Sequence, residues 1–530
     1  MSKVSPHLEA HILKYVPGLM LGAILVIGAT LRFKHIWNNQ FSYDEGILGN
    51  VALNWLQTGL PTRNFPGQVL FYDHPPLWWL AKALSFSLFG LNKFSLRLPA
   101  LSCGILLVLV VYLLVRELLF RQDRKGYFGA LTAALLVAMN QVFIHLARTS
   151  HVEVGVQLAG MLSLYFMFVA FRKRSAWFHC LAGFTTFITF SIKYSGFFFV
   201  ILVLITMLGQ MFVERKVKPG VFWLIGFGGA ALVMSVGLFW LYSEQYFTTF
   251  LKVSLFLPIV HVLSPEAVSA AWRITDLQEY LDRLYGWYHP IPLLFLLSLL
   301  IVIAEIFWRI KQRTLTWHWP DVQIIFCGLP LVWILFLTVY SAASRSIPYS
   351  SLAVPLFTVF IGFQIQRIAT LLQKKVNTPA IKRENSVMPR TRFYLKCYGP
   401  GVLLMLFLWF LHSSYQFAES MYEKEKAKNY TPTDPAEVVG HFLTSRFPLE
   451  NTFVSSTHGP QIALISGWRY DLAYDVRELK QFQDKLKLAR IYVQYGTLKY
   501  LKKPQEVEQY LTSEYTAGLI YKHIYYYYRE

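Results

Sequence analysis

Acidic, histidine and proline residues gather in one stretch between the first two hydrophobic segments of the chain. Three short motifs carry them: Tyr43-Asp44-Glu45, Tyr72-Asp73-His74-Pro75-Pro76-Leu77 and Arg97-Leu98-Pro99. A carboxylate at Asp44 or Glu45 could accept a proton from an attacking hydroxyl or amine, which is general-base chemistry. The alternative is that the acids only cap a helix over residues 45–56. The stretch is the first candidate for an active site.

The diproline after His74 gives the second motif a defined geometry. Proline fixes its own backbone and restricts the residue before it, so Asp73 and His74 are held in one direction. Held beside a membrane, His74 could pair with a phosphate, while Asp73 could ligate a metal or orient a base. A plain structural turn at the start of a helix would use the same residues.

Further ionisable residues interrupt later apolar segments. Arg148 and Glu153 flank the expected start of a fourth span, with His151 between them. Charged groups at membrane depth usually face a cavity and have partners, and the alternative for these two is an interfacial ion pair. Lys193 breaks the apolar stretch 185–200, where it could also extend harmlessly to the lipid headgroups.

Two short segments near the expected outer face complete the candidate set. Arg345 and Tyr349 lie in a turn where a guanidinium and a phenol could hold a lipid phosphate. His289, next to two prolines, could join Asp73 in binding a divalent metal, although a lone histidine is more often structural. Gly-x-Gly-x-x-Gly and Walker motifs are absent from the sequence.

The composition predicts an α-helical polytopic membrane protein. Of the 530 residues, 55% are hydrophobic, 17% aromatic and only 15% charged, and apolar runs recur from residue 16 to 411. The net charge of +20 comes from short basic clusters between these runs, which indicates positive-inside topology rather than nucleic-acid binding. Placing the clusters in the cytoplasm gives about eleven spans, with the N-terminus inside and the C-terminus outside. This requires residues 75–90 to lie on the outer surface without crossing.

Two domains are expected. Residues 1–411 form the membrane domain, with outer loops 32–97 and 242–288, and the first apolar run is a retained span. Residues 412–530 have a soluble composition and predict a small extracytoplasmic α/β domain. Its expected elements are a helix that starts at Asp434-Pro435, a second helix over 476–486, and strands over 452–455 and 489–493. The four cysteines suggest no disulfide framework.

Together these residues resemble the GT-C glycosyltransferases of the protein O-mannosyltransferase and lipid A aminoarabinose transferase group. The similar pieces follow the family order over about 350 residues. They are Tyr43-Asp44-Glu45-Gly46, Tyr72 to Leu77, Leu96-Arg97-Leu98-Pro99, Ala147-Arg148 to Glu153, Ile192-Lys193-Tyr194-Ser195-Gly196, His289 to Pro292, and Arg345 to Pro355. His74 matches the mannosyltransferases, whereas the aminoarabinose transferases have lysine there. The inserted β-trefoil of the eukaryotic mannosyltransferases is absent.

The resemblance implies an inverting transfer of a sugar from a polyprenyl-phosphate donor to a lipid, glycan or protein acceptor outside the plasma (inner) membrane. Asp44 would be the general base, Glu45 would help to place the acceptor, and Glu153 would be the acid of the second loop. The residues implied to bind the donor phosphate are His74, Arg148, Lys193, Arg345 and Tyr349. No cofactor is required, apart from a candidate divalent metal on Asp73 and His289.

Two other classes of protein would share this composition. A transporter or flippase of lipid-linked glycans should carry ionisable residues in mid-span together with repeats or broken helices. A catalytically dead scaffold would have no need of Asp44, Asp73, His74, Glu153 and Arg345 together. Because the acids gather in outer loops, the sequence favours a transferase.

Overall fold

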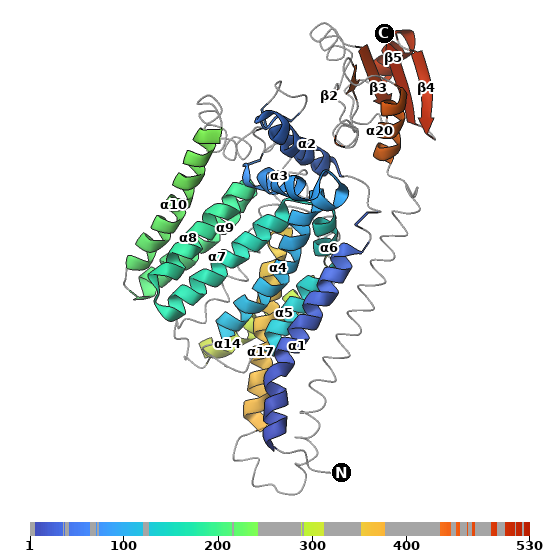
Figure 1. The fold of residues 1–530 in the computed structure, drawn as a ribbon. Helices are drawn as coiled ribbons and strands as arrows, with labels where there is room; N and C mark the ends of the chain where they lie inside the picture. Colours follow the sequence, from blue (N-terminus) through green and yellow to red (C-terminus); the bar gives the residue numbers. More distant parts are fainter. Residues whose placement is uncertain are drawn as a thin grey trace, which may run out of the picture.

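The structure is a computed structural model of the chain. It describes residues 6–34, 36–37, 42–63, 70–71, 74–119, 127–214, 217–241, 288, 291–311, 351–376, 435–446, 452–455, 464, 469–471, 489–494, 504–514, 516–521 and 524–529. These residues form a bundle of long helices, followed along the chain by a β-sheet with short helices (Figure 1).

Long apolar helices form the first part of the chain, as the composition predicts. The helices are α1 (Pro6–Phe33), α2 (Tyr43–Thr58), α3 (Leu77–Phe89), α4 (Lys93–Leu119), α5 (Phe128–Met139), α6 (Gln141–Arg148), α7 (Glu153–Lys173), α8 (Ala176–Ile192), the 3₁₀ turn η1 (Tyr194–Gly196), α9 (Phe197–Glu214), α10 (Lys218–Leu241), α14 (Ile291–Lys311) and α17 (Val354–Val376). Five candidate spans are found in the described residues, or six if the bent pair α5 and α6 is one span. The chain is therefore a multi-pass helical membrane protein. The predicted spans that end near residues 340 and 411 fall outside the described residues, so the total of about eleven stays a prediction.

The third predicted span, 127–146, is bent. The axes of α5 and α6 differ by 52° across Asn140. The Asn140 side chain accepts hydrogen bonds from the backbone N–H groups of Val142 and Phe143 at 3.1 and 3.4 Å. A side-chain cap of this kind starts a new helix in place of continuing the old one, which explains the break.

The predicted outer loop 32–97 is mostly helical. It contains α2 and α3, which lie across one end of the bundle in Figure 1, and α3 matches the short helix expected within 75–90. The helix α4 begins at Lys93, so Arg97 belongs to a helix and not to the loop. The reason is a reciprocal cap: Ser95 N–H donates to Asn92 Oδ1 at 2.9 Å, and Asn92 N–H donates to Ser95 Oγ at 3.1 Å.

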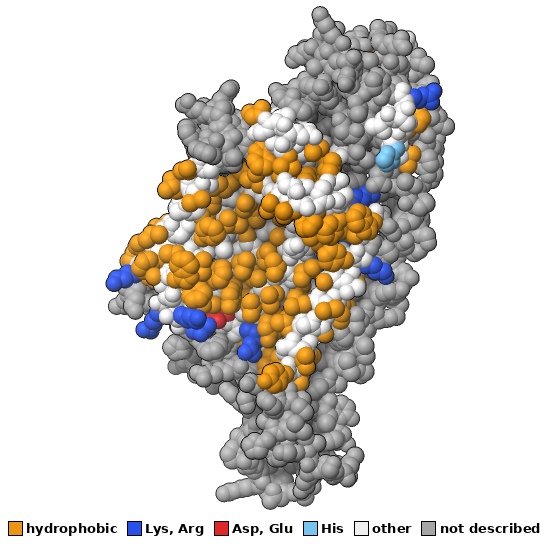
Figure 2. Space-filling view, in the orientation of Figure 1, with side chains coloured by type: hydrophobic (Ala, Val, Ile, Leu, Met, Phe, Trp, Pro, Cys, Tyr) orange, Lys and Arg blue, Asp and Glu red, His pale blue; other side chains and the backbone are white. Residues whose placement is uncertain are grey.

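The helices α7 and α8 connect two chemically different ends of the bundle. Glu153 begins α7, Lys193 follows α8, and the two side chains form an ion pair at the end near α2 and α3. Arg172 and Lys173 lie in the last turn of α7, and α10 begins at Lys218. Figure 2 shows Lys and Arg gathered at this second end, with apolar side chains covering the bundle above them. Basic residues are therefore concentrated opposite the end that carries α2.

The C-terminal part contains α20 (Pro435–Arg446), α23 (Pro504–Glu514), β1 (Thr452–Ser455), β2 (Arg469–Asp471), β3 (Ala489–Gln494), β4 (Thr516–Tyr521) and β5 (Ile524–Arg529). The sheet order is β2-β1-β3-β5-β4; β1 is parallel to both neighbours, and β5 is antiparallel to both of its own. The predicted helix start at Pro435 and strands at 452–455 and 489–493 are confirmed. The predicted helix 476–486 and the cap Asp434 lie outside the described residues.

Candidate active site

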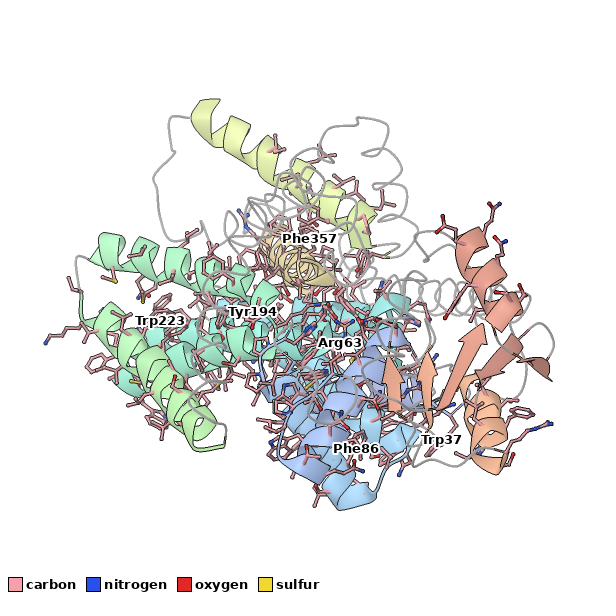
Figure 3. All side chains as sticks on the ribbon, turned by 90° about the horizontal axis from the view of Figure 1, so that it is seen from above. Trp37, Arg63, Phe86, Tyr194, Trp223 and Phe357 are labelled. Carbon is pink, nitrogen blue, oxygen red and sulfur yellow. The ribbon has the colours of Figure 1, made fainter. Side chains whose placement is uncertain are left out.

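The candidate residues that the structure describes lie at the end of the bundle that carries α2 and α3. The elements involved are the first turns of α2 and α4, the helix α3, the turn 149–152 between α6 and α7, and Lys193 after α8. Figure 3 looks onto this end. Arg63, which follows α2, and Tyr194, which follows Lys193, lie there between Phe86 of α3 and Phe357 of α17.

The first turn of α2 separates two adjacent acids. Asp44 is exposed, whereas Glu45 is only 1% exposed. Arg97 of α4 binds Glu45 through two hydrogen bonds, Nε to Oε1 at 2.6 Å and Nη2 to Oε2 at 3.1 Å. Glu45 also completes a capping box, because Ser42 N–H donates to Glu45 Oε2 at 2.8 Å. The helix-cap interpretation of the sequence is correct for Glu45, although the cap is buried and not solvated.

Electrostatics keeps Glu45 ionised inside the protein. Burial alone would raise the pKa of Glu45, but the Arg97 charge and hydrogen bonds, with the Ser42 N–H, lower the pKa below its usual value. The carboxylate thus serves as a fixed link between α2 and α4. The link sets the first turn of α2 and leaves the neighbouring Asp44 facing solvent.

A second buried acid lies at the start of α7. Glu153 is 1% exposed, and its Oε1 accepts a hydrogen bond from Lys193 Nζ at 2.5 Å. Its other oxygen lies 3.6 Å from His151 Nδ1. Burial alone would lower the pKa of His151, but the neighbouring Glu153 reverses the effect and the pKa is raised, with Asp44 contributing in the same direction. Asp44 is therefore within electrostatic range of this group.

Two other predicted residues have identifiable contacts. Arg148 donates from Nε to the Leu31 carbonyl at 3.0 Å and from Nη2 to the same oxygen, which fastens α6 to the end of α1. His74 is half-buried and stacks on Phe71, with ring centroids 5.8 Å apart.

Four predicted residues fall outside the described residues: Asp73, His289, Arg345 and Tyr349. Within the part of the chain that the structure describes, no group of three or more His, Cys, Asp or Glu side chains could hold a metal ion. The expected metal pair Asp73 and His289 is therefore not tested.

Lys82 is a functional candidate that the sequence analysis missed. It lies on α3, is fully buried, and donates hydrogen bonds to the Leu96 carbonyl at 3.3 Å and to Ser150 Oγ. Burial lowers its pKa to about 7, an effect that the charges of Glu45 and Asp44 partly offset. The available signal was a single charge within an otherwise apolar helix.

Comparisons of the sequence with known proteins support the resemblance. Residues 73–240 match the family described as dolichyl-phosphate-mannose-protein mannosyltransferase. YkcB of Bacillus subtilis (strain 168), whose name marks it as a candidate mannosyltransferase, is 24% identical over 160 residues. An uncharacterised protein of Aquifex aeolicus (strain VF5) is 23% identical over 165 residues. The matches cover 29% and 31% of this chain, but only 21% of YkcB and 31% of the Aquifex protein.

Solved structures show the same fold over most of the chain. ArnT from Cupriavidus metallidurans, bound to undecaprenyl phosphate, superposes with a TM-score of 0.57 at 12% identity, covering 99% of this chain and 98% of ArnT. The oligosaccharyltransferase AglB from Archaeoglobus fulgidus, in complex with an inhibitory peptide and a dolichol-phosphate, gives 0.57 at 13% identity, covering 90% and 69%. Residues 73–240 thus match the family model described as dolichyl-phosphate-mannose-protein mannosyltransferase, and the chain shares the fold of ArnT and AglB.

Proposed function

We propose that this protein is an inverting glycosyltransferase that moves a sugar from a polyprenyl-phosphate donor to a lipid, glycan or protein acceptor on the outer face of the membrane. The observation that supports this proposal most directly is that Asp44 is exposed beside the buried Glu45–Arg97 pair. The basic residues at the opposite end of α7 support this orientation, because positive loops stay in the cytoplasm. ArnT and AglB, which share the fold, have solved structures with undecaprenyl phosphate and a dolichol-phosphate, respectively.

The reaction is a single displacement at the anomeric carbon of the sugar. Asp44 accepts the proton of the acceptor hydroxyl or amine as that atom forms its bond to the carbon. The bond between the carbon and the phosphate oxygen breaks on the opposite face, and the polyprenyl phosphate leaves with the electron pair. Because one displacement inverts the carbon, the product has the opposite anomeric configuration.

Cations stabilise the phosphate as its negative charge grows. His74, Lys193, Arg148, Arg345 and Tyr349 are the proposed donor-binding residues. For Glu45, the burial and the Arg97 pair favour a positioning role, in which it holds Asp44 without touching the acceptor. Glu153, buried between Lys193 and His151, positions Lys193 in the same way.

A metal requirement remains a separate question. AglB from Archaeoglobus fulgidus has also been crystallised with Zn and sulfate. Asp73 and His289 are the proposed ligands in this chain. Dialysis against EDTA, followed by assays with and without added Zn²⁺ or Mn²⁺, tests the requirement directly; unchanged transfer after chelation would remove the metal from the proposal.

The proposed function is tested by sugar transfer with the purified protein in lipid nanodiscs. The donors are polyprenyl phosphates that carry radiolabelled mannose, glucose or aminoarabinose. Asp44→Asn should lower kcat by about 10²-fold or more, the usual cost of losing a general base. Glu506→Gln makes the same chemical change at an exposed position of α23 and should leave transfer unchanged. Full activity of Asp44→Asn would remove Asp44 from the mechanism.

A further inference from the structure

Lys82 is a buried cation at this end of the bundle, and within the described residues its hydrogen bonds run to neutral groups. Glu45 pairs with Arg97 and Glu153 pairs with Lys193, so each of those buried pairs is electrically balanced. Lys82 donates to the Leu96 carbonyl and to the Ser150 hydroxyl. An ammonium group taken out of water into such surroundings is costly, and an apolar helix such as α3 needs no lysine for its packing.

Ser150, the partner of Lys82, occupies an unusual place in the backbone. Its φ is 53°, in the left-handed region that residues other than glycine adopt rarely. It lies in the turn between α6 and α7, one residue before His151 and three before Glu153. Ser150 Oγ also donates to the Leu96 carbonyl at 2.9 Å, so Lys82, Ser150 and α4 form one connected group.

We propose that Lys82 is a positioning residue for the transfer reaction, because it fastens the turn 149–152 to α4 and supplies a positive charge beside the Glu45–Arg97 pair. This inference rests on the proposed function. The groups that face Lys82 are Glu45 and Asp44 on α2, Arg97 on α4, and the turn with Ser150. The charge of Lys82 helps to lower the pKa of Glu45, so it supports the ionised link between α2 and α4.

The two parts of this role can be separated by substitution. Ser150→Gly removes the hydroxyl at a backbone conformation that glycine adopts freely, so it loosens the turn without strain and keeps the ammonium. Lys82→Met removes the charge and keeps a similar length of apolar side chain. Lys82→Arg restores the charge and the donors, and it is the conservative rescue.

Transfer by the full-length protein in nanodiscs is then measured from pH 5 to 9. Lys82→Met should lower kcat about tenfold or more and move the acidic limb of the pH profile upward, because Glu45 loses a nearby positive charge that lowers its pKa. Ser150→Gly should lower kcat a few-fold and leave the acidic limb in place. Lys82→Arg should return the limb toward the wild-type position. A purely structural lysine would lower activity in Lys82→Met without moving the limb.

Hydrogen–deuterium exchange of the turn gives a second readout that needs no activity. Both Lys82→Met and Ser150→Gly should speed exchange of the backbone amides of residues 149–154, compared with the exposed control Glu506→Gln. If the wild type transfers no sugar while exchange rises as expected, the proposed function fails and the fastening role stands. A folded Lys82→Met protein with wild-type exchange, kcat and pH profile overturns the inference.

Discussion

Replacing Arg97 with methionine should severely destabilise the end of the bundle that carries α2 and α3. The change leaves Glu45 buried without its cation, and it also removes the hydrogen bond from Arg97 to the Ile36 carbonyl. Removal of one partner of a buried ion pair costs about 3–5 kcal/mol. At about 1.4 kcal/mol for each power of ten, the ratio of folded to unfolded protein should fall about 10²- to 10⁴-fold.

The pH dependence of stability should change sign in this variant. In the wild type the pKa of Glu45 is lowered, so its contribution is present above the usual carboxyl range and is lost as pH falls through the lowered value. Without Arg97 the remaining effect on the carboxyl is mainly burial, which raises its pKa. A raised pKa stabilises the folded state at low pH and loses this effect as pH rises. Arg97→Met should therefore be more stable at pH 5 than at pH 7.5, relative to the wild type.

Tryptophan fluorescence during heating in nanodiscs gives the apparent Tm, measured at one scan rate because membrane proteins often unfold irreversibly. The double variant Glu45→Gln/Arg97→Met removes both charges and should recover much of the loss, since no unpaired charge stays buried. The reasoning is refuted if Arg97→Met costs less than about 1 kcal/mol, or if the double variant is as unstable as the sum of the single ones.

Two smaller predictions test packing and charge elsewhere in the bundle. A Cβ at Gly155 would lie 2.5 Å from Cζ3 of Trp78, so Gly155→Ala should cost about 1–3 kcal/mol as α3 is forced from α7. At Gly229 an added Cβ would meet no atom within 4 Å beyond its own helix backbone and chain neighbours, so Gly229→Ala should be neutral or stabilising; equal midpoints for the two variants would contradict this packing. Arg172 pairs with Glu117 at a partly exposed position, so Arg172→Ala should lower the free energy of unfolding by at most about 1 kcal/mol. A larger loss would mean that the ion pair is shielded from solvent more than its exposure indicates.

The helices were predictable because apolar runs of span length leave the chain few alternatives in lipid. The residues at which the helices begin and end were less predictable. The start of α4 at Lys93 depends on the reciprocal cap of Asn92 and Ser95, and the bend at Asn140 depends on a side chain that accepts two backbone N–H groups. Such polar residues occur in loops equally often, so composition alone places these boundaries a few residues wrong.

The types of residue at the site could be predicted from the sequence, but which of these residues pair with one another could not. Asp44 and Glu45 look equivalent in the sequence, yet one is exposed and the other buried. The difference comes from Arg97, which lies 52 residues further along the chain. Lys82 was overlooked for the same reason: its partner Ser150 lies 68 residues away, and only the packing of α3 on the turn brings them together.

These long-range pairs also bear on the choice between a transferase and a transporter. The Glu45–Arg97 pair links α2 to α4, and the Glu153–Lys193 pair links α7 to the end of α8. A transporter that alternates access at this end would have to separate such helices, and any of these charges left buried without its partner would cost about 3–5 kcal/mol. A transferase needs the opposite, since a base and the cations around a leaving phosphate act only when their geometry is fixed before reaction. Two buried ion pairs around an exposed carboxylate therefore fit catalysis better than transport.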